Sequence, residues 1–247
     1  MRYLENPLML KIHYQDEHLV VVHKPSGLLV HRSNIDRYET RFLLQLLRDQ
    51  IGQQVFPVHR LDKPTSGLMV FALNKPCTQL LGQAFADKTI KKSYLAVLRG
   101  YTEDQIIDYP LKEELDKMTD AKAQQDKAAQ EAVSEVTLLA TCELPIPVGR
   151  YEQARFSLVK LRPQTGRKHQ LRRHMAHIRH PIIGDTTHGD GKQNAFAREH
   201  LQLNRLALIA HQLSFTHPIT HELISCEADI DDDLQAIMDI FEDKKEL

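Results

Sequence analysis

Short apolar stretches, each closed off by turn-forming residues, set the strongest limit on how this 247-residue chain can fold. In its first half, four stretches of β-like composition lie at residues 10–14, 19–23, 55–59 and 68–73. Pro25-Ser26-Gly27 follows the second stretch, and Pro64-Thr65-Ser66-Gly67 lies between the third and the fourth. Because Pro and Gly at these places favour turns, the stretches are predicted to be separate strands of a sheet.

Two helices are predicted among these strands. Residues 40–51 place apolar side chains along one side of a helix, and Gly52 is positioned to end it. Asn74 is a suitable N-cap for a second helix that runs to about residue 86. Pro76 is tolerated there, because the first turn of a helix does not need its backbone N–H.

The second half continues the pattern. Strand-like segments are predicted at residues 90–98, 132–140, 155–161 and 206–215. Between the last two, residues 167–178 have helical spacing with Leu171 and Met175 on one face. A final acidic helix is expected over about 229–247, since negative charges near 231–233 suit a helix N-terminus. Many strands with few helices between them favour a single α+β domain over 1–247, with a mixed, mostly antiparallel central sheet flanked by helices and loops.

Residues 103–131 differ from the rest of the chain. Acids and lysines crowd together there, and residues 121–130 form a polar tract without aromatic side chains. We expect an exposed excursion that is partly helical or mobile, because such a composition cannot bury much apolar surface.

The net charge of −1 hides an uneven distribution. Residues 150–180 hold nine Lys or Arg and one acid, Glu152, which gives +8. Residues 227–247 hold nine acids and two lysines, which gives −7. One face of the folded chain is therefore expected to attract phosphates while the acidic end neutralises the total, although a basic run alone is more often a solvated surface.

Several classes of protein are disfavoured. The hydrophobic share of 42% is ordinary for a globular chain and not for a disordered one. Neither a signal peptide nor a membrane-spanning run is visible, so we expect a cytoplasmic protein with no membrane partner. Cys77, Cys142 and Cys226 lie too far apart in sequence for a zinc or redox motif. Neither a P-loop nor GxGxxG is present, so no nucleotide cofactor is expected.

The segment HRLDKPTSG, residues 59–67, lies between two predicted strands. Pro64 keeps Lys63 out of the helical region, and Thr65-Ser66-Gly67 favours a turn, so Asp62 should sit on a short rigid loop. A carboxylate on a loop braced by a sheet is well placed for catalysis. The alternative is that Asp62 only hydrogen-bonds the backbone of its own turn.

The segment GRKHQLRRH, residues 166–174, loads the start of a predicted helix with cations. Helical spacing puts Lys168 and Arg172 on one side while Leu171 faces the core. An arginine there could pair with a carboxylate and favour its ionised form. The alternatives are a phosphate contact alone or a solvent-exposed basic helix.

Histidines at 174, 177 and 180 recur every third residue, which raises the question of a metal. Zinc sites usually combine histidine with cysteine or acidic partners, and Arg173 and Arg179 would repel a cation. We therefore expect no metal site.

The segments HRLDKPTSG and TGRKHQLRRH together strongly resemble the RluA-type family of pseudouridine synthases. HKPSGLLVH upstream, Lys92-Ser93-Tyr94 and HPIIGDTTHGD downstream match the same family in the same order. The resemblance runs from about residue 10 to residue 218 and implies a mixed, mostly antiparallel sheet crossed by an RNA-binding cleft. Some relatives carry an N-terminal RNA-binding domain of the ribosomal S4 type, but HKPSG begins at His23, so none is expected here.

The same resemblance implies roles for individual residues. Asp62 corresponds to the catalytic aspartate, Tyr94 to the active-site tyrosine and Arg172 to the basic partner of Asp62. Arg60 would fill the gap left in the RNA when the target base leaves its stack. The other candidate RNA contacts are His59, Arg167, Lys168, His169 and Arg173.

The implied reaction breaks the bond from ribose to uracil nitrogen, turns the base and rejoins it through carbon C5. No cofactor is expected, because nothing is oxidised or brought in from outside. Asp62 must be ionised to act as nucleophile or base, and the sequence leaves open whether it attacks the base or the sugar or removes a ribose proton. Tyr94 would stack on the uracil and assist removal of the C5 proton.

Three further segments, VHRSNIDR, YPLKEELDK and VGRY, are similar to the member of this family that acts on uridine-65 of tRNA. We therefore expect tRNA as the partner, and because the sequence has no strong exposed apolar pattern, we expect a monomer. Within the family, the alternative substrate is ribosomal RNA or another tRNA position. Outside it, the alternatives are a non-catalytic RNA-binding protein, for which Asp62 would be dispensable, and a histidine-metal hydrolase, which chelators would inhibit.

Overall fold

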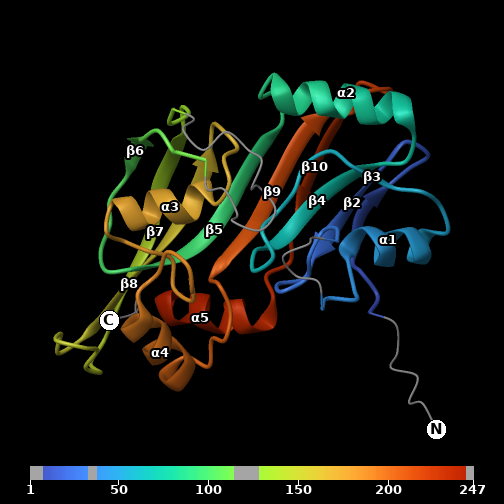
Figure 1. Ribbon diagram of the computed structural model, residues 1–247. Helices are drawn as coiled ribbons and strands as arrows, with labels where there is room; N and C mark the ends of the chain where they lie inside the picture. The colour runs from blue at the N-terminus through green and yellow to red at the C-terminus, as the bar shows by residue number, and fades with distance from the viewer. Residues whose placement is uncertain (1–7, 33–37, 114–127, 243–247) are drawn as a thin grey trace, which may run out of the picture.

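The computed structural model describes residues 8–32, 38–113 and 128–242 (Figure 1). The strands are β1 (Ile12–Gln15), β2 (Leu19–Lys24), β3 (Phe56–Pro57), β4 (Ser66–Ala72), β5 (Lys91–Arg99), β6 (Gln105–Asp108), β7 (Val133–Leu144), β8 (Ala154–Pro163), β9 (Leu208–Thr216) and β10 (Leu223–Glu227). The helices are α1 (Leu43–Ile51), α2 (Lys75–Ala86), α3 (Gln170–His177), α4 (Gly191–His200) and α5 (Asp232–Glu242).

These strands join in one sheet with the order β1-β2-β4-β9-β5-β8-β7-β6, while β3 pairs with β4 and β10 pairs with β9. All described pairs are antiparallel except β4 with β9. In Figure 1, α1 and α3 lie in front of the two halves of the sheet, with α2 along its upper end and α4 and α5 near its lower end. The predicted α+β class with a mixed, mostly antiparallel sheet is confirmed.

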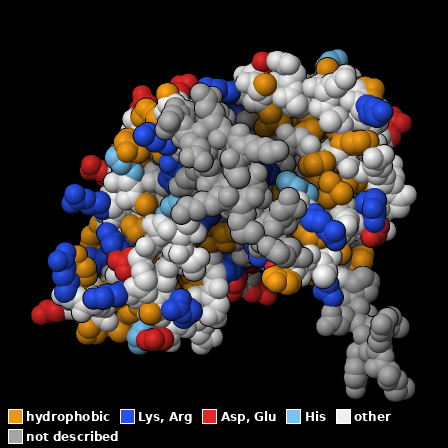
Figure 2. All heavy atoms as spheres, in the orientation of Figure 1, with side chains coloured by type: hydrophobic (Ala, Val, Ile, Leu, Met, Phe, Trp, Pro, Cys, Tyr) orange, Lys and Arg blue, Asp and Glu red, His pale blue; other side chains and the backbone are white. Residues whose placement is uncertain are grey.

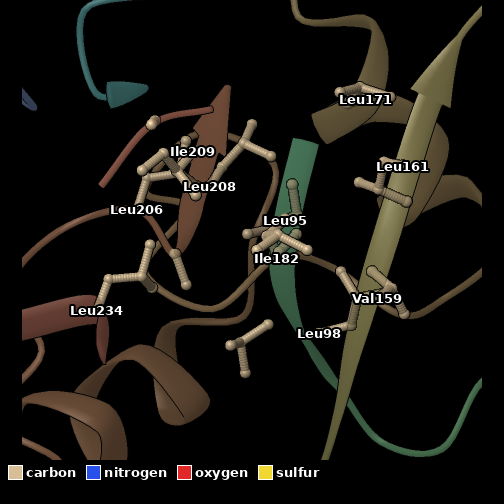
Figure 3. Packing of buried hydrophobic residues seen from close by; sticks show 14 of the residues in the cluster. Leu95, Leu98, Val159, Leu161, Leu171, Ile182, Leu206, Leu208, Ile209 and Leu234 are labelled. Carbon is tan, nitrogen blue, oxygen red and sulfur yellow. The ribbon is translucent and has the colours of Figure 1, made fainter. Parts of the chain in front are cut away.

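Both faces of the sheet are buried at its centre. On β2, Val20 packs with Leu43 of α1 in one hydrophobic cluster, whereas its neighbour Val21 belongs to a second cluster with Leu81 of α2 and Leu234 of α5. Successive strand residues point to opposite faces, so the two clusters lie on the two sides of β2. Figure 3 shows part of the larger cluster, where side chains from β5, β8, β9 and α3 meet.

The parallel joint between β4 and β9 is close-packed. Gly67 pairs with Ala210 across this joint and has φ of 108°, which favours glycine. A Cβ atom on Gly67 would lie 2.3 Å from the carbonyl oxygen of Ala210. The glycine of the HRLDKPTSG segment therefore allows β9 to approach the strand that follows Asp62.

Several local predictions are confirmed. The side chain of Asn74 caps α2 by accepting a hydrogen bond from the Cys77 backbone N–H at 2.9 Å. Gly52 ends α1 in the left-handed conformation with φ of 72°. Leu171 and Met175 of α3 are both buried, as their spacing predicted.

Other local predictions need correction. The helix predicted over 167–178 begins only at Gln170, because His169 adopts a left-handed conformation with φ of 54°. The predicted polar excursion over 103–131 contains β6, which pairs with β7, and residues 114–127 lie outside the described part of the chain. The acidic C-terminal helix spans Asp232–Glu242, and 243–247 are likewise outside it. Helix α4 and strand β10 were not predicted.

Candidate active site

Asp62 lies in the loop between β3 and β4, at the middle of the sheet. The loop folds back on itself where the Thr65 backbone N–H donates to the Asp62 carbonyl oxygen at 3.1 Å, and the neighbouring Leu61 is buried in the core. The Asp62 side chain retains 21% exposure and lines two adjoining cavities. The predicted short loop braced by strands is therefore present, and its carboxylate faces open space.

A buried lysine joins this loop to the HKPSG segment. The Lys24 ammonium donates to the carbonyl oxygens of Pro25, Leu28 and Lys63 at 2.9, 2.8 and 3.0 Å. The hydroxyl of Ser26 adds a bond to the Pro64 carbonyl at 2.8 Å. Burial lowers the pKa of Lys24 to about 7, although the charge of the nearby Asp62 opposes the shift. This lysine was quoted within a motif but not assigned a role from the sequence.

Arg172 reaches the same carboxylate from α3. Its Nη1 atom lies 3.5 Å from Asp62 Oδ2, so the predicted ion pair is present. The shorter bonds of Arg172 go elsewhere: Nε and Nη2 donate to the two carboxylate oxygens of Asp185, each at 2.8 Å. Asp185, which stands in the HPIIGDTTHGD motif and is 2% exposed, was not predicted as a site residue from the sequence.

Tyr94 stands on β5, next to a register shift that follows Ser93. It lines the smaller cavity, of about 340 Å³, together with Asp62 and Arg172. Burial raises the pKa of the Tyr94 phenol, and the charge of Asp62 raises it further. The three residues predicted as catalytic are thus brought to one cavity from three separate parts of the chain.

The larger cavity, of about 1380 Å³, is rich in cations. Its described lining holds nine Lys or Arg against four Asp or Glu. The cations are Arg32, Arg60, Lys63, Lys112, Arg167, Lys168, Arg172, Arg173 and Arg205. On the face of the molecule that carries α1 and α3, Figure 2 shows Lys and Arg side chains near both helices. A wide cavity with a surplus of positive charge suits a phosphate-bearing ligand.

The predicted RNA contacts divide into two groups. Arg60, Arg167 and Lys168 are exposed and line both cavities. His169, which also lines both, places Nε2 3.9 Å from Asp62 Oδ1. Arg173 lines the larger cavity and donates to the carbonyl oxygen of Lys112 at 2.9 Å.

His59 differs from these residues, because in the described part of the chain it does not line either cavity. Its Nε2 atom accepts a hydrogen bond from the Val70 backbone N–H at 3.0 Å, and its ring stacks on Phe85 of α2. Burial lowers the pKa of His59 to about 3, so the ring is neutral near pH 7. Its position is that of a residue that holds the loop to the sheet.

A second ionic cluster borders the larger cavity. Asp231, just before α5, accepts hydrogen bonds from Ser66 at 2.7 Å and from Arg205, and it lies 3.0 Å from the ring of His23. Burial alone would raise the pKa of Asp231, but these bonds lower it. The acidic C-terminal segment therefore anchors the start of β4 and does not simply balance charge at a distance.

The regularly spaced histidines take part in the packing of the fold. Both ring nitrogens of His174 lie within hydrogen-bond distance of protein oxygens, at 2.9 Å from Ser134 Oγ and 3.0 Å from the Tyr109 carbonyl. His177 stacks on the Tyr109 ring, and His180 bonds the Arg99 carbonyl. Within the described residues, no group of three or more His, Cys, Asp or Glu side chains is arranged to hold a metal ion.

Comparison with known proteins gives the family. A family model described as RNA pseudouridylate synthase matches residues 18–177, well over half of the chain, and the match contains Asp62, Tyr94 and Arg172. The chain belongs to the RNA pseudouridylate synthase family. It is therefore an isomerase that forms pseudouridine in RNA. Asp185 lies eight residues after the end of the matched segment.

Relatives of this RNA pseudouridylate synthase match over nearly its whole length. It is 53% identical over 234 residues to the tRNA pseudouridine synthase C of Vibrio cholerae, covering 94% of this chain and 96% of the relative. The protein of the same name from Haemophilus influenzae is 53% identical, with 94% and 98% covered. Human RNA Pseudouridylate Synthase Domain Containing 1 superposes with a TM-score of 0.67 at 26% identity, covering 90% of this chain and 84% of that one. Among the described residues of this synthase, no helix is long and apolar enough to cross a membrane.

Proposed function

We propose that this synthase isomerises a uridine of tRNA and that Asp62 is its catalytic carboxylate. The single observation that carries the role of Asp62 is its position, partly exposed in a cation-lined cavity with Arg172 and Tyr94. The choice of tRNA is supported by the relatives named tRNA pseudouridine synthase C, which match over nearly the whole chain. The alternative of a non-catalytic RNA-binding protein gives no reason for a carboxylate at the centre of a basic cavity.

The reaction needs few chemical groups. Uridine and pseudouridine are isomers, so the protein has only to break the bond to nitrogen, hold the freed base and allow it to rejoin through C5. The Asp62 carboxylate acts as nucleophile or base toward the nucleoside, and the Arg172 guanidinium lies 3.5 Å from it. No cofactor is part of the proposal.

Tyr94 completes the site as a neutral phenol. Because burial raises its pKa, the hydroxyl form and not the phenolate meets the substrate near neutral pH. Its ring gives the uracil a surface for stacking, and its hydroxyl can hold a water molecule close to C5. The proposal therefore assigns Tyr94 to placing the base and assisting the proton transfer.

The cations of the larger cavity have a different task. A base must leave its helix to reach Asp62, which costs a few kcal/mol that contacts with the RNA backbone have to offset. Arg60, which is exposed and lies in the same loop as Asp62, is suited to occupy the space left by the base. Arg167, Lys168 and Arg173 are suited to hold the flanking phosphates.

The first test replaces Asp62 with asparagine, which keeps size but removes the charge. We expect Asp62→Asn to release no tritium from tRNA transcripts labelled at uridine C5, while it still binds the same RNA in a filter-binding assay. Asp16→Asn is the matched control, because Asp16 lies at the β1–β2 turn and is absent from the described lining of both cavities. Release at the wild-type rate by Asp62→Asn would end the proposal.

The position within the RNA needs a separate measurement. The VHRSNIDR, YPLKEELDK and VGRY segments support uridine-65 of tRNA as the target. The proposal includes a monomeric enzyme that acts in the cytoplasm. Mapping pseudouridine in RNA from cells that lack the protein should show the loss of that one tRNA modification. Loss from ribosomal RNA or from another tRNA position would instead reassign the substrate.

A further inference from the structure

Besides its contact with Asp62, Arg172 makes two parallel, buried hydrogen bonds to Asp185, which together form a fork. Its Nε and Nη2 atoms donate in parallel to Asp185, and both side chains are almost fully buried, with 4% and 1% exposure. Two parallel bonds fix the plane of a guanidinium as well as its position. The one remaining nitrogen, Nη1, then faces Asp62 Oδ2 at 3.5 Å.

Asp185 is itself firmly placed. Its Oδ1 atom accepts hydrogen bonds from the backbone N–H groups of Thr187 and His188, both at 2.9 Å. The Asn194 side chain of α4 donates to the Asp185 carbonyl oxygen at 2.8 Å and accepts from the Gly184 N–H at 2.8 Å. The carboxylate of Asp185 is thus held by the turn that follows it, and the backbone of Asp185 is held by α4.

Such a pair is a weak choice if stability were its only purpose. Removing two charges from water costs several kcal/mol for each ion, and well-packed apolar residues often replace buried pairs without loss. What an apolar replacement could not do is orient Nη1 toward Asp62. A catalytic group that moves by about 1 Å can cost about a hundredfold in rate.

We propose that Asp185 is a positioning residue for the reaction, acting through Arg172 to hold its guanidinium against Asp62. The inference rests on the proposed catalytic role of Asp62. Asp185 does not line either cavity among the described residues, so it has no direct contact with substrate to explain an effect on turnover.

The test compares two aspartates of the same segment. Asp185→Asn puts an amide N–H opposite one of the guanidinium donors, which breaks the fork. We expect kcat for tritium release from C5-labelled tRNA transcripts to fall about a hundredfold, with KM within about threefold of wild type. Asp190→Asn is the matched control, since Asp190 also pairs with an arginine, Arg99, and accepts from two backbone N–H groups, but outside both cavities.

Stability is separated from positioning by two additions. Melting curves of both variants are recorded, and Asp185→Glu, which keeps the charge but moves the carboxylate by one methylene, replaces Asp185→Asn if the latter melts below the assay temperature. A fall in kcat at a normal melting temperature supports the inference. The inference is overturned if the Asp185 variant used in the assay has the same kcat as Asp190→Asn.

A double-mutant cycle tests whether Asp185 acts through Arg172. In the background of Arg172→Lys, which cannot make the parallel bonds, Asp185→Asn should lower kcat by no more than about twofold further. Losses that multiply would overturn the inference. If Asp62→Asn keeps wild-type activity, the proposed function fails first; if Asp62→Asn is inactive and Asp185→Asn is not impaired, only the present inference fails.

Discussion

Lys24 shows how a single buried charge can hold two loops in register. Its ammonium bonds carbonyl oxygens of Pro25 and Leu28 after β2 and of Lys63, the residue after Asp62. A neutral amine has only two N–H donors, so one of the three bonds weakens when the proton leaves. The geometry of the loop that carries Asp62 is therefore linked to the protonation of Lys24.

This linkage gives a prediction for stability. The pKa of Lys24 is about 7 in the folded chain and near its ordinary value of 10.5 in the unfolded chain. Between these values the unfolded chain binds more protons, so the Lys24 contribution to the free energy of unfolding rises with pH. We expect the difference between wild type and Lys24→Met to shift in favour of wild type from about pH 7 to about pH 10. Urea unfolding across this range measures it, and a difference that stays constant would contradict it.

Single residues also show where the sequence was informative. The position of Asp62 on a short loop could be predicted because Pro64 and the turn after it restrict the backbone there, whereas its catalytic role was implied only by the family resemblance. Arg172 was predicted as its partner, but the stronger bond to Asp185 could not be foreseen. Nothing in the spacing of a helix and a later turn shows that both side chains are buried together.

Among the elements, the parallel pairing of β4 with β9 brings the two halves of the sheet together beside the loop that carries Asp62. Gly67 allows this contact by its positive φ and by the missing Cβ atom. Any larger residue there must push β9 away or distort the start of β4, four residues after Lys63.

Gly67→Ala is therefore expected to lower the free energy of unfolding by about 1 to 3 kcal/mol or more, as overpacking does in well-packed cores. Gly82→Ala on α2 is the matched control, because a Cβ atom there meets nothing within 4 Å. Alanine in a helix is favoured over glycine by about 1 kcal/mol, so the control should be neutral or more stable. Urea unfolding of both variants measures the contrast, and equal stabilities would show that the joint is not tight.

The elements that were missed had weak or ambiguous signals. Strand β10 has alternating burial, with Ile224 inward between the exposed Leu223 and Ser225, but it spans only five residues. Helix α4 carries few apolar side chains, so the strongest sequence signal for it was Asp190, which caps its N-terminus. The start of α3 was misplaced because His169 adopts a left-handed conformation that local propensity does not favour.

For the whole molecule, the basic run over 150–180 divides in the structure. Arg155 and Arg162 on β8 pair with Glu143 and Glu135 on the neighbouring β7, as cross-strand neighbours do. The later part of the run, which includes Lys168, lines the cavities. The charge of +8 follows from the sequence. Which of these cations are paired with acids of β7 and which line the cavities depends on strand pairing, which composition does not reveal.

This division predicts which charges RNA binding should depend on. Each cation that neutralises a phosphate releases a counterion, so log K changes with log salt by about 0.9 for each contact in a duplex and about 0.7 in a single strand. We expect Lys168→Gln to reduce the salt slope of tRNA binding by about one. Arg162→Gln should leave it unchanged, because that guanidinium is held 2.8 Å from Glu135 and lies outside the described lining of the cavities.

The measurement is filter binding of tRNA to Asp62→Asn protein over a series of salt concentrations, which separates binding from turnover. Both substitutions remove one positive charge, so a general effect of net charge would change the two slopes alike. A smaller slope for Lys168→Gln alone places the RNA backbone along the cavity beside Asp62. A smaller slope for Arg162→Gln alone would place the RNA backbone on the outer face of β7 and β8. The cavity would then have to bind the uridine without contacts to the phosphates of the flanking nucleotides.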